Sequence, residues 1–97
     1  PESRYGWAVV AAFYAAVHYV HAYLWERHRA NPRSHPARGQ RVQRDSILRQ
    51  CERQYLGRLE VSLRARYDRL YDIPETRARE LVEEDLAHVE ATVMAAI

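Results

Sequence analysis

Residues 29–41, RANPRSHPARGQR, place four arginines and one histidine among two prolines and a glycine. A histidine can move a proton at a ribose hydroxyl, and an arginine can neutralise the charge that develops on phosphorus during RNA cleavage. His35, Arg29 and Arg38 are therefore the candidates for catalysis, with Arg38 one helical turn after His35. A simpler interpretation is that His35 helps to begin a helix and that solvated arginines surround it. The residue pattern favours this simpler interpretation.

The segment belongs to a wider basic region. Residues 27–53 carry eight arginines against Asp45 and Glu52, a local net charge of +6, whereas residues 72–97 carry seven acids against Arg77 and Arg79, a net charge of −5. Either the two halves neutralise each other in the folded protein, or the basic half presents an anion-binding surface. The composition supports both interpretations equally.

Two further groups of residues have to be weighed for chemistry. His18 and His21 lie one helical turn apart, but a metal site needs three or four ligands and no cysteine or acid completes this set. We therefore expect core or interface histidines, no metal and no cofactor. Cys51, the only cysteine, lies on an apolar stripe and is expected in the core. A single cysteine excludes an internal disulfide and favours a cytoplasmic location.

The sequence predicts an all-α protein. Its three glycines and four prolines cluster at a few points, and no alternating strand pattern appears. We expect residues 1–97 to form one domain, an antiparallel up-and-down bundle of four or five helices. The first helix, predicted over residues 4–29, has an apolar stripe at spacings of three and four. Its members are Trp7, Val10, Tyr14, Val17, His21 and Leu24, widened by Phe13 and Val20.

The remaining helices follow from capping residues. Ser34 is a good N-cap with Pro36 in the first turn, which predicts a short helix over residues 35–44. Asp45 or Ser46 can cap a third helix, although whether these residues break the chain stays open. Gly57 suggests a close helix crossing. In the last helix, Asp72 is the predicted cap, with Glu75 three residues later.

Apolar residues define one side of each of these two helices. For the third helix they are Ile47, Leu48, Cys51, Tyr55, Leu59, Ser62, Tyr67 and Leu70. For the fourth they are Leu81 or Val82, Leu86, Val89, Val93 and Ile97. Arg64 and Asp68 stand four residues apart, which predicts a surface ion pair.

The first helix raises two questions of environment. The nineteen residues from Trp7 to Trp25 carry no formal charge, which is about the length that spans a bilayer. Histidines and tyrosines inside this run would be costly in hydrocarbon, so we expect a buried helix and no membrane contact. The run also carries more aromatic and alanine surface than a small bundle can cover, which predicts a homodimer. Since the chain begins at Pro1 without a methionine, we expect its natural N-terminus to lie upstream or to be processed.

Three segments in this order, FYAAVHYVHAYL, SHPARGQRV and YLGRLEVSLRARYD, resemble the HEPN domain (higher eukaryotes and prokaryotes nucleotide-binding). The resemblance covers about residues 5 to 90. It implies a helical bundle, commonly dimeric, that acts beside a nucleotidyltransferase partner in toxin–antitoxin pairs. It also implies a ligand-facing cluster for RNA or a nucleotide. On this chain the cluster, which is either structural or ligand-facing, comprises His35, Arg38, Arg66, Tyr67 and Asp68. The candidate residues for binding RNA or a nucleotide are His35, Arg38, Arg41, Arg66 and Tyr67.

Many HEPN domains are metal-independent ribonucleases with an Arg-x(4–6)-His motif late in the bundle. This sequence departs from that pattern. Its only histidine after residue 50 is His88, and Arg79 precedes it by nine positions. Arg29 and His35 have the required spacing but fall in the first connection between helices. We therefore expect a binding module for RNA, a nucleotide or a nucleotidyltransferase. The alternatives are a ribonuclease with a displaced site at Arg29, His35 and Arg38, and a purely structural dimerisation domain.

Overall fold

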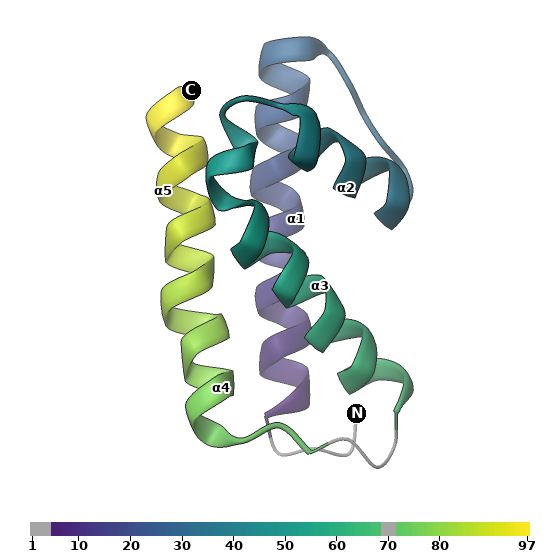
Figure 1. Ribbon diagram of the computed structural model, residues 1–97, viewed down its shortest axis with the longest axis vertical. Coiled ribbons are helices and arrows are strands. Elements are labelled where there is room, and N and C mark those ends of the chain that lie inside the picture. Colours follow the sequence, from purple (N-terminus) through teal and green to yellow (C-terminus); the bar gives the residue numbers. More distant parts are fainter. Residues whose placement is uncertain (1–4, 69–71) are drawn as a thin grey trace.

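The computed structural model describes residues 5–68 and 72–97, and this part of the chain is helical and contains no strand. The elements are α1 (Gly6–His28), α2 (His35–Arg44), the 3-10 turn η1 (Leu48–Cys51), α3 (Glu52–Tyr67), α4 (Glu75–Arg79), the π-helical η2 (Glu80–Asp85) and α5 (Leu86–Ala96). α1, α3 and the continuous run from α4 to α5 alternate in direction, and α2 lies across one end of α1 (Figure 1). The predicted all-α bundle is confirmed, with four helical segments in the described residues.

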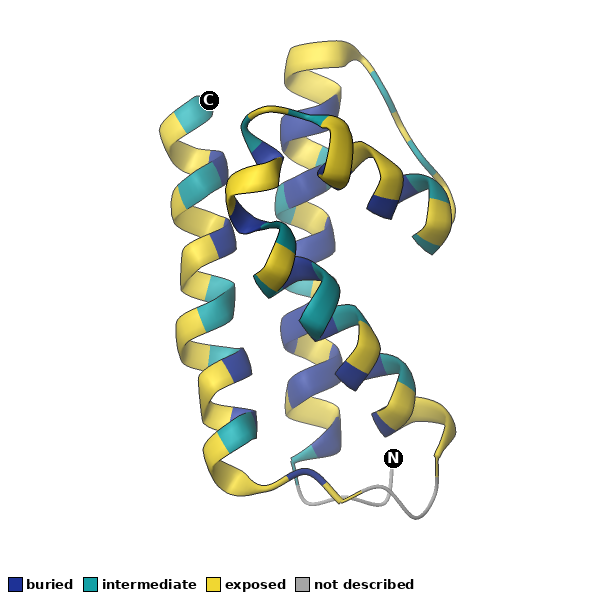
Figure 2. Cartoon of the chain, viewed as in Figure 1, coloured by how far each residue is buried: buried dark blue, intermediate teal, exposed yellow. Residues whose placement is uncertain are grey.

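The core forms where α1, α3 and α5 face one another, as the dark blue residues in Figure 2 show. α1 is central because valine, alanine and phenylalanine recur on one of its faces. The buried residues of this face are Val9, Val10, Ala12, Phe13, Ala16, Val17, Val20, Tyr23 and Leu24. The prediction that Trp7 and Tyr14 belong to the buried stripe is wrong, since they are 64% and 37% exposed. They lie on a second stripe of three- and four-residue spacing, which turns outward.

The local signals around α2 are confirmed. The Ser34 hydroxyl accepts a hydrogen bond from the N–H of Ala37 at 3.2 Å, and Pro36 stands in the first turn. The question of a break at Asp45 is also settled. Asp45 ends α2 in an extended conformation, and its Oδ1 accepts hydrogen bonds from the N–H groups of Ile47 and Leu48 at 2.8 and 3.0 Å. The carboxylate therefore holds the turn that leads into η1, whose N-cap residue is Ile47.

Several details of α3 differ from the predictions. Tyr67 is 72% exposed, so its place on the apolar side is wrong, and Leu70 lies outside the described residues. Gly57 does not mark a tight crossing: a Cβ at this position would meet Nη2 of Arg77 at 3.7 Å, an ordinary contact distance. Cys51 is buried as predicted, and its thiol lies 3.3 Å from the carbonyl oxygen of Leu48.

The last helix begins later than predicted. Pro74 is its N-cap and no side chain caps it, so the assignment of Asp72 as the cap is wrong. Leu81, Val89 and Val93 are buried, which confirms most of the predicted apolar side. Ile97 is 57% exposed, because the helix ends at Ala96 beyond the reach of the core.

α1 is long and apolar enough to cross a membrane by length and composition, with a mean hydropathy of 1.3 over its most apolar window. Half of that window is buried inside the bundle. The helix packs along α3 and α5, so its inward face is already covered by protein. This burial is the packing expected of the central helix of a compact bundle.

Candidate functional site

A cleft of about 640 Å³ opens between α2 and the end of α1. Six of the nine residues that line it have polar side chains, and the full lining is Leu24, His28, Asn31, Pro32, Ala37, Gln40, Arg41, Arg44 and Asp45. Arg41 and Arg44 are exposed, and within residues 5–68 and 72–97 no ion pair involves either guanidinium. Glu75, Glu80 and Asp85 pair instead with Arg77 and Arg79 of their own acidic half. The basic charge of the cleft is thus available to an anion.

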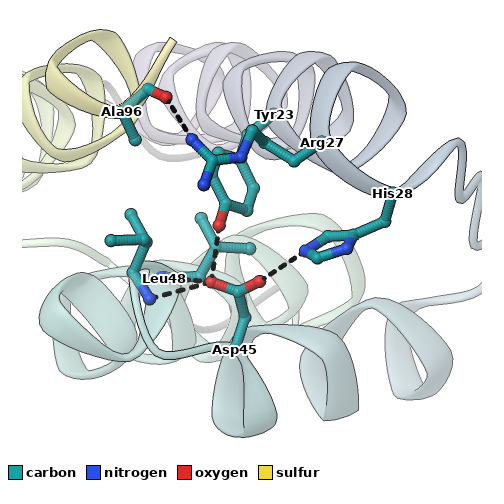
Figure 3. A network of polar contacts seen from close by, with 7 residues as sticks. Tyr23, Arg27, His28, Asp45, Leu48 and Ala96 are labelled. Carbon is teal, nitrogen blue, oxygen red and sulfur yellow. Dashed lines mark hydrogen bonds and ion pairs between the residues drawn. The ribbon is translucent and has the colours of Figure 1, made fainter.

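One wall of the cleft is built around the carboxylate of Asp45, which points from the α2–η1 corner toward α1 (Figure 3). The Tyr23 hydroxyl donates to Oδ1 at 2.8 Å, and Nε2 of His28 lies 3.0 Å from Oδ2. Burial by itself raises the pKa of Asp45. Hydrogen bonds from the backbone of Leu48, from Tyr23, from the backbone of Ile47 and from His28 outweigh burial, and the pKa is lowered. Asp45 is therefore a carboxylate at neutral pH.

His28 is held by this carboxylate at the rim of the cleft. A carboxylate can only accept, so Nε2 of His28 carries the proton and donates to Asp45. The second ring nitrogen, Nδ1, makes no hydrogen bond within the part of the chain that the structure describes. The Tyr23 ring packs edge-on against the imidazole, with 6.0 Å between ring centroids. The hydrogen bond to Asp45 therefore fixes the orientation of the His28 ring, and Nδ1 has no protein partner among the described residues.

The end of α1 that carries His28 is also anchored to α5. Nη1 of Arg27 donates to the carbonyl oxygen of Ala96 at 2.8 Å, next to the Asp45 network in Figure 3. The Arg27 guanidinium lies 5.9 Å from the centroid of the Tyr23 ring. Burial, followed by the hydrogen bond to Asp45, raises the pKa of Tyr23 to about 12. Tyr23 thus remains a hydrogen-bond donor across the physiological range.

A second cluster forms where Arg38 of α2 joins two histidines. Its Nε donates to Nε2 of His21 at 3.0 Å, and its Nη1 donates to Nδ1 of His35 at 2.9 Å. Arg38 is only 6% exposed. Burial and the Arg38 charge lower the pKa of both histidines, while a hydrogen bond to the Pro32 backbone opposes this shift at His21. Two neutral imidazoles therefore hold a buried guanidinium.

Arg66 and two tyrosines extend this second cluster toward the solvent. The Arg66 guanidinium donates to the Tyr14 hydroxyl and lies 5.6 Å from the Tyr14 ring centroid and 5.3 Å from that of Tyr67. It is near enough to His35 to lower the pKa of that imidazole. Phe13 bridges the group, with its ring centroid 5.6 Å from that of His35. The structure therefore brings His35, Arg38, Arg66 and Tyr67 together.

The other two residues predicted from the sequence lie elsewhere. Arg41 lines the cleft. Arg29 follows α1 in the left-handed conformation, with φ of 51°, and its guanidinium lies 5.3 Å from the centroid of the Trp25 ring. Within the described residues no hydrogen bond or ring contact joins Arg29 to His35, so the spacing of these two residues does not translate into a shared site.

The pairing of His28 with Asp45 is not predictable from the sequence. The residue pattern indicates Asp45 only as a helix cap, and no spacing rule connects residues 17 apart in different elements. The sequence around Arg58 likewise does not predict that this side chain is completely buried. All three guanidinium nitrogens of Arg58 lack a hydrogen-bond partner, and burial lowers its pKa to about 10 despite the nearby Asp85.

The remaining histidines have simpler roles. His18 is exposed on α1, and the His88 ring lies 3.1 Å from the carbonyl oxygen of Gln50. Across residues 5–68 and 72–97, no three histidine, cysteine or acidic side chains gather closely enough to hold a metal ion.

The chain matches no protein-family model, no curated protein and no solved structure. A functional proposal therefore rests on the geometry of these two clusters.

Proposed function

We propose that this chain is a HEPN-like helical module that binds single-stranded RNA through the cleft beside α2. The observation that carries the proposal is the position of Arg41 and Arg44 in an open cleft without an acidic partner among the described residues. Unpaired arginines on a concave surface attract phosphate, and release of counterions then drives binding. The amides of Asn31 and Gln40 line the same cleft and offer hydrogen bonds to sugar or base.

The second cluster supports the same ligand class. Tyr67 presents an exposed ring, and Arg66 lies close to it. Bases of single-stranded RNA stack on tyrosine rings and on guanidinium planes. Arg38 serves differently in this proposal. Since it is buried and bonded to two histidines, it positions α2 and contacts no phosphate directly.

Fluorescence anisotropy with a labelled oligouridylate, measured at several salt concentrations, tests the proposal. Arg41→Ala and Arg44→Ala should each weaken binding and reduce the slope of log K against log salt by about 0.7 for every phosphate that the variant no longer neutralises. Arg79→Ala is the matched control, because Arg79 is an exposed arginine on α4 that pairs with Glu75. The proposal fails if all three variants bind alike. Competition by a mononucleotide at equal phosphate concentration would identify a nucleotide as the ligand instead.

A second proposal, homodimer formation, rests on the outward face of α1. This face consists of exposed residues at spacings of three and four: Trp7, Ala11, Tyr14, His18, Ala22 and Trp25. Trp7 and Trp25 stand at the two ends of this face, Tyr14 and His18 stand at its middle, and one alanine separates each tryptophan from the middle pair. In an antiparallel pair related by a two-fold axis, Trp7 of one copy would meet Trp25 of the other, and Tyr14 would meet His18. Trp7 and Trp25 are 64% and 53% exposed, and apolar side chains that gather on one exposed face mark an interaction site.

Light scattering at micromolar concentration tests the dimer. The wild-type chain should show twice the 11.4 kDa mass of one copy, and Trp25→Glu should reduce it to a monomer. Met94→Glu is the control, since Met94 is equally exposed but lies on α5. A wild-type monomer would refute the proposal.

Two further proposals follow, the first from the resemblance and the second from the single cysteine. One is a nucleotidyltransferase partner in a toxin–antitoxin pair, which co-expression with the product of the adjacent gene tests through co-purification. The other is a cytoplasmic location, for which the free, buried thiol of Cys51 is the support. Fractionation of cells that express the chain tests this location.

A further inference from the structure

We propose that a groove between α2 and α3 holds one adenine base of an RNA strand whose phosphates lie in the cleft. This inference rests on the proposed RNA-binding function and adds a base-specific site to it. The groove has a volume of about 330 Å³, within the size range of small-ligand sites. α3 contributes Leu56, Leu59 and Leu63 to its lining, and α2 contributes the polar side chains of His35, Gln40 and Gln43. Apolar walls with a few polar groups are typical of such sites.

The groove and the cleft meet at Gln40, which lines both of them. Arg41 and Arg44 line the cleft alone, whereas the three leucines line the groove alone. A ligand that reaches from one hollow to the other across Gln40 therefore needs a negative charge next to an apolar surface. A nucleotide within an RNA strand has this arrangement, because its phosphate carries the charge and its base has two apolar faces.

Gly39 widens the groove, of which it is a lining residue. It is buried in the interior of α2, where glycine is less favourable than alanine. The backbone does not require glycine here, since no glycine of the described residues has a positive φ. Crowding does not require it either. The one atom of another helix that a Cβ would meet within 4 Å is Cδ2 of Leu56, at 3.7 Å, an ordinary contact distance. The missing side chain thus leaves space beside Leu56, inside the groove.

The polar side chains of the groove favour adenine among the four bases. Nδ1 of His35 accepts a hydrogen bond from Arg38 at 2.9 Å, so Nε2 of the neutral ring carries the proton and can donate to a ligand. Gln43 is exposed at the groove. A glutamine carboxamide accepts from N6 of adenine and donates to N7, which makes a bidentate pair. As a purine, adenine also covers more of the leucine wall than a pyrimidine does.

Fluorescence anisotropy with three labelled oligomers tests the site. The first is an oligouridylate, the second has one central adenosine, and the third has purine riboside, which lacks the exocyclic amine, in place of that adenosine. Their phosphate number is equal, so the electrostatic contribution to binding cancels and the difference in Kd reports the base. The wild-type chain should bind the adenosine oligomer about 10-fold more tightly than the oligouridylate, and purine riboside should lose most of this preference.

Gly39→Ala should bind the adenosine oligomer and the oligouridylate alike, because the added methyl group fills space beside Leu56. The same variant should melt at a higher temperature than the wild type, since alanine favours the helix. Gly57→Ala is the matched control. A Cβ at Gly57 would also meet another helix at 3.7 Å, at Nη2 of Arg77, but Gly57 does not line the groove. This control should keep the preference for adenosine.

Gln43→Met keeps the length of the side chain without its amide. This variant should bind the adenosine and purine riboside oligomers alike, because the hydrogen bonds to the base edge are gone. It tests the site independently of any effect that Gly39→Ala has on the helix.

The outcomes separate the two proposals. If the wild-type chain binds all three oligomers alike, and Arg41→Ala and Arg44→Ala still weaken binding, the adenine site is overturned and the binding proposal stands. The groove is then open to an apolar side chain of a protein partner instead. Loss of the adenosine preference in Gly57→Ala as well as in Gly39→Ala would also overturn the site, since the effect would not come from the groove. If the wild-type chain binds no RNA, the proposed function fails and the adenine site fails with it.

Discussion

Nε of Arg38 donates a hydrogen bond to Nε2 of His21 at 3.0 Å, and this bond joins α2 to α1. The two residues are 17 positions apart, and Arg38 also donates to His35. Arg38 is buried, with 6% of the residue exposed. Removal of its guanidinium would leave both imidazoles with no hydrogen-bond donor at this buried position. The contact explains why the most suggestive arginine of the 29–41 segment is a structural residue.

Arg38→Ala should destabilise the protein by about 2–3 kcal/mol, because the variant lacks both the hydrogen bonds from a charged donor and the packing of its stem. Chemical denaturation measures the free energy of unfolding. Arg41→Ala, which removes an exposed arginine of the same helix, should change it by less than about 0.5 kcal/mol. Equal effects of the two variants would contradict the structural role of Arg38.

Stability should fall as the pH drops below about 6.5, the ordinary value for histidine. The pKa values of His21 and His35 are lowered in the folded state, by burial and by the Arg38 charge, with Arg66 acting on His35 and His18 on His21. The unfolded chain then binds more protons, so stability is complete at higher pH and declines toward the folded pKa values. Melting temperatures between pH 7.5 and 5.5 measure the effect, and His21→Gln should reduce it. A flat profile for the wild type would count against the arrangement.

Asp45→Ala should cost about 1–2 kcal/mol, because the carboxylate accepts hydrogen bonds from the N–H groups of Ile47 and Leu48 and also from Tyr23 and His28. Its pKa is lowered in the fold, so its contribution is present above the ordinary value of 3.8 and is lost as the pH falls through the folded pKa. Denaturation at pH 7 and at pH 3 separates the two states. Tyr23→Phe, which removes one donor, should have a smaller effect; a larger effect would mean that the hydrogen bonds from the Ile47 and Leu48 backbone contribute little.

Arg29→Gly should stabilise the protein by about 1 kcal/mol. Arg29 ends α1 with φ of 51°, where a side chain is disfavoured and glycine is not. The Trp25 ring no longer packs against a guanidinium in this variant, which offsets part of the gain. The test compares the melting temperatures of Arg29→Gly and Arg29→Ala, since alanine also removes the guanidinium but keeps a side chain in the disfavoured conformation. The two variants should differ in favour of glycine.

Arg58→Met should raise stability by about 1–4 kcal/mol, because an unpaired buried charge is replaced by an apolar side chain of similar length. The guanidinium nitrogens of Arg58 have no hydrogen-bond partner, and burial lowers the pKa to about 10. Arg53→Met is the comparison, since Arg53 is an exposed arginine five residues earlier on the same helix. A less stable Arg58→Met would show that the charge of Asp85 compensates Arg58 more fully than the hydrogen-bond geometry suggests.

The sequence by itself determined the features that depend on residues close together in the chain. The scarcity of glycine and proline predicts helices, Ser34 and Pro36 set the start of α2, and the apolar stripe around Cys51 places this thiol in the core. Propensity and capping act directly over such short distances, which is why these predictions are confirmed. The break at Asp45 is an intermediate case, because the sequence offers a residue that can end α2 without showing that the chain turns there.

Only the tertiary structure decided which of two stripes of α1 turns inward. Trp7 and Tyr14 follow the same three- and four-residue spacing as the buried face, so periodicity cannot distinguish them. The face rich in valine and alanine turns inward, where α3 and α5 pack closely against it. Rules for residues close together in the sequence could not predict the contact between His28 and Asp45 either. The contact exists because the chain reverses between α1 and α2, which brings the carboxylate back to the end of the first helix.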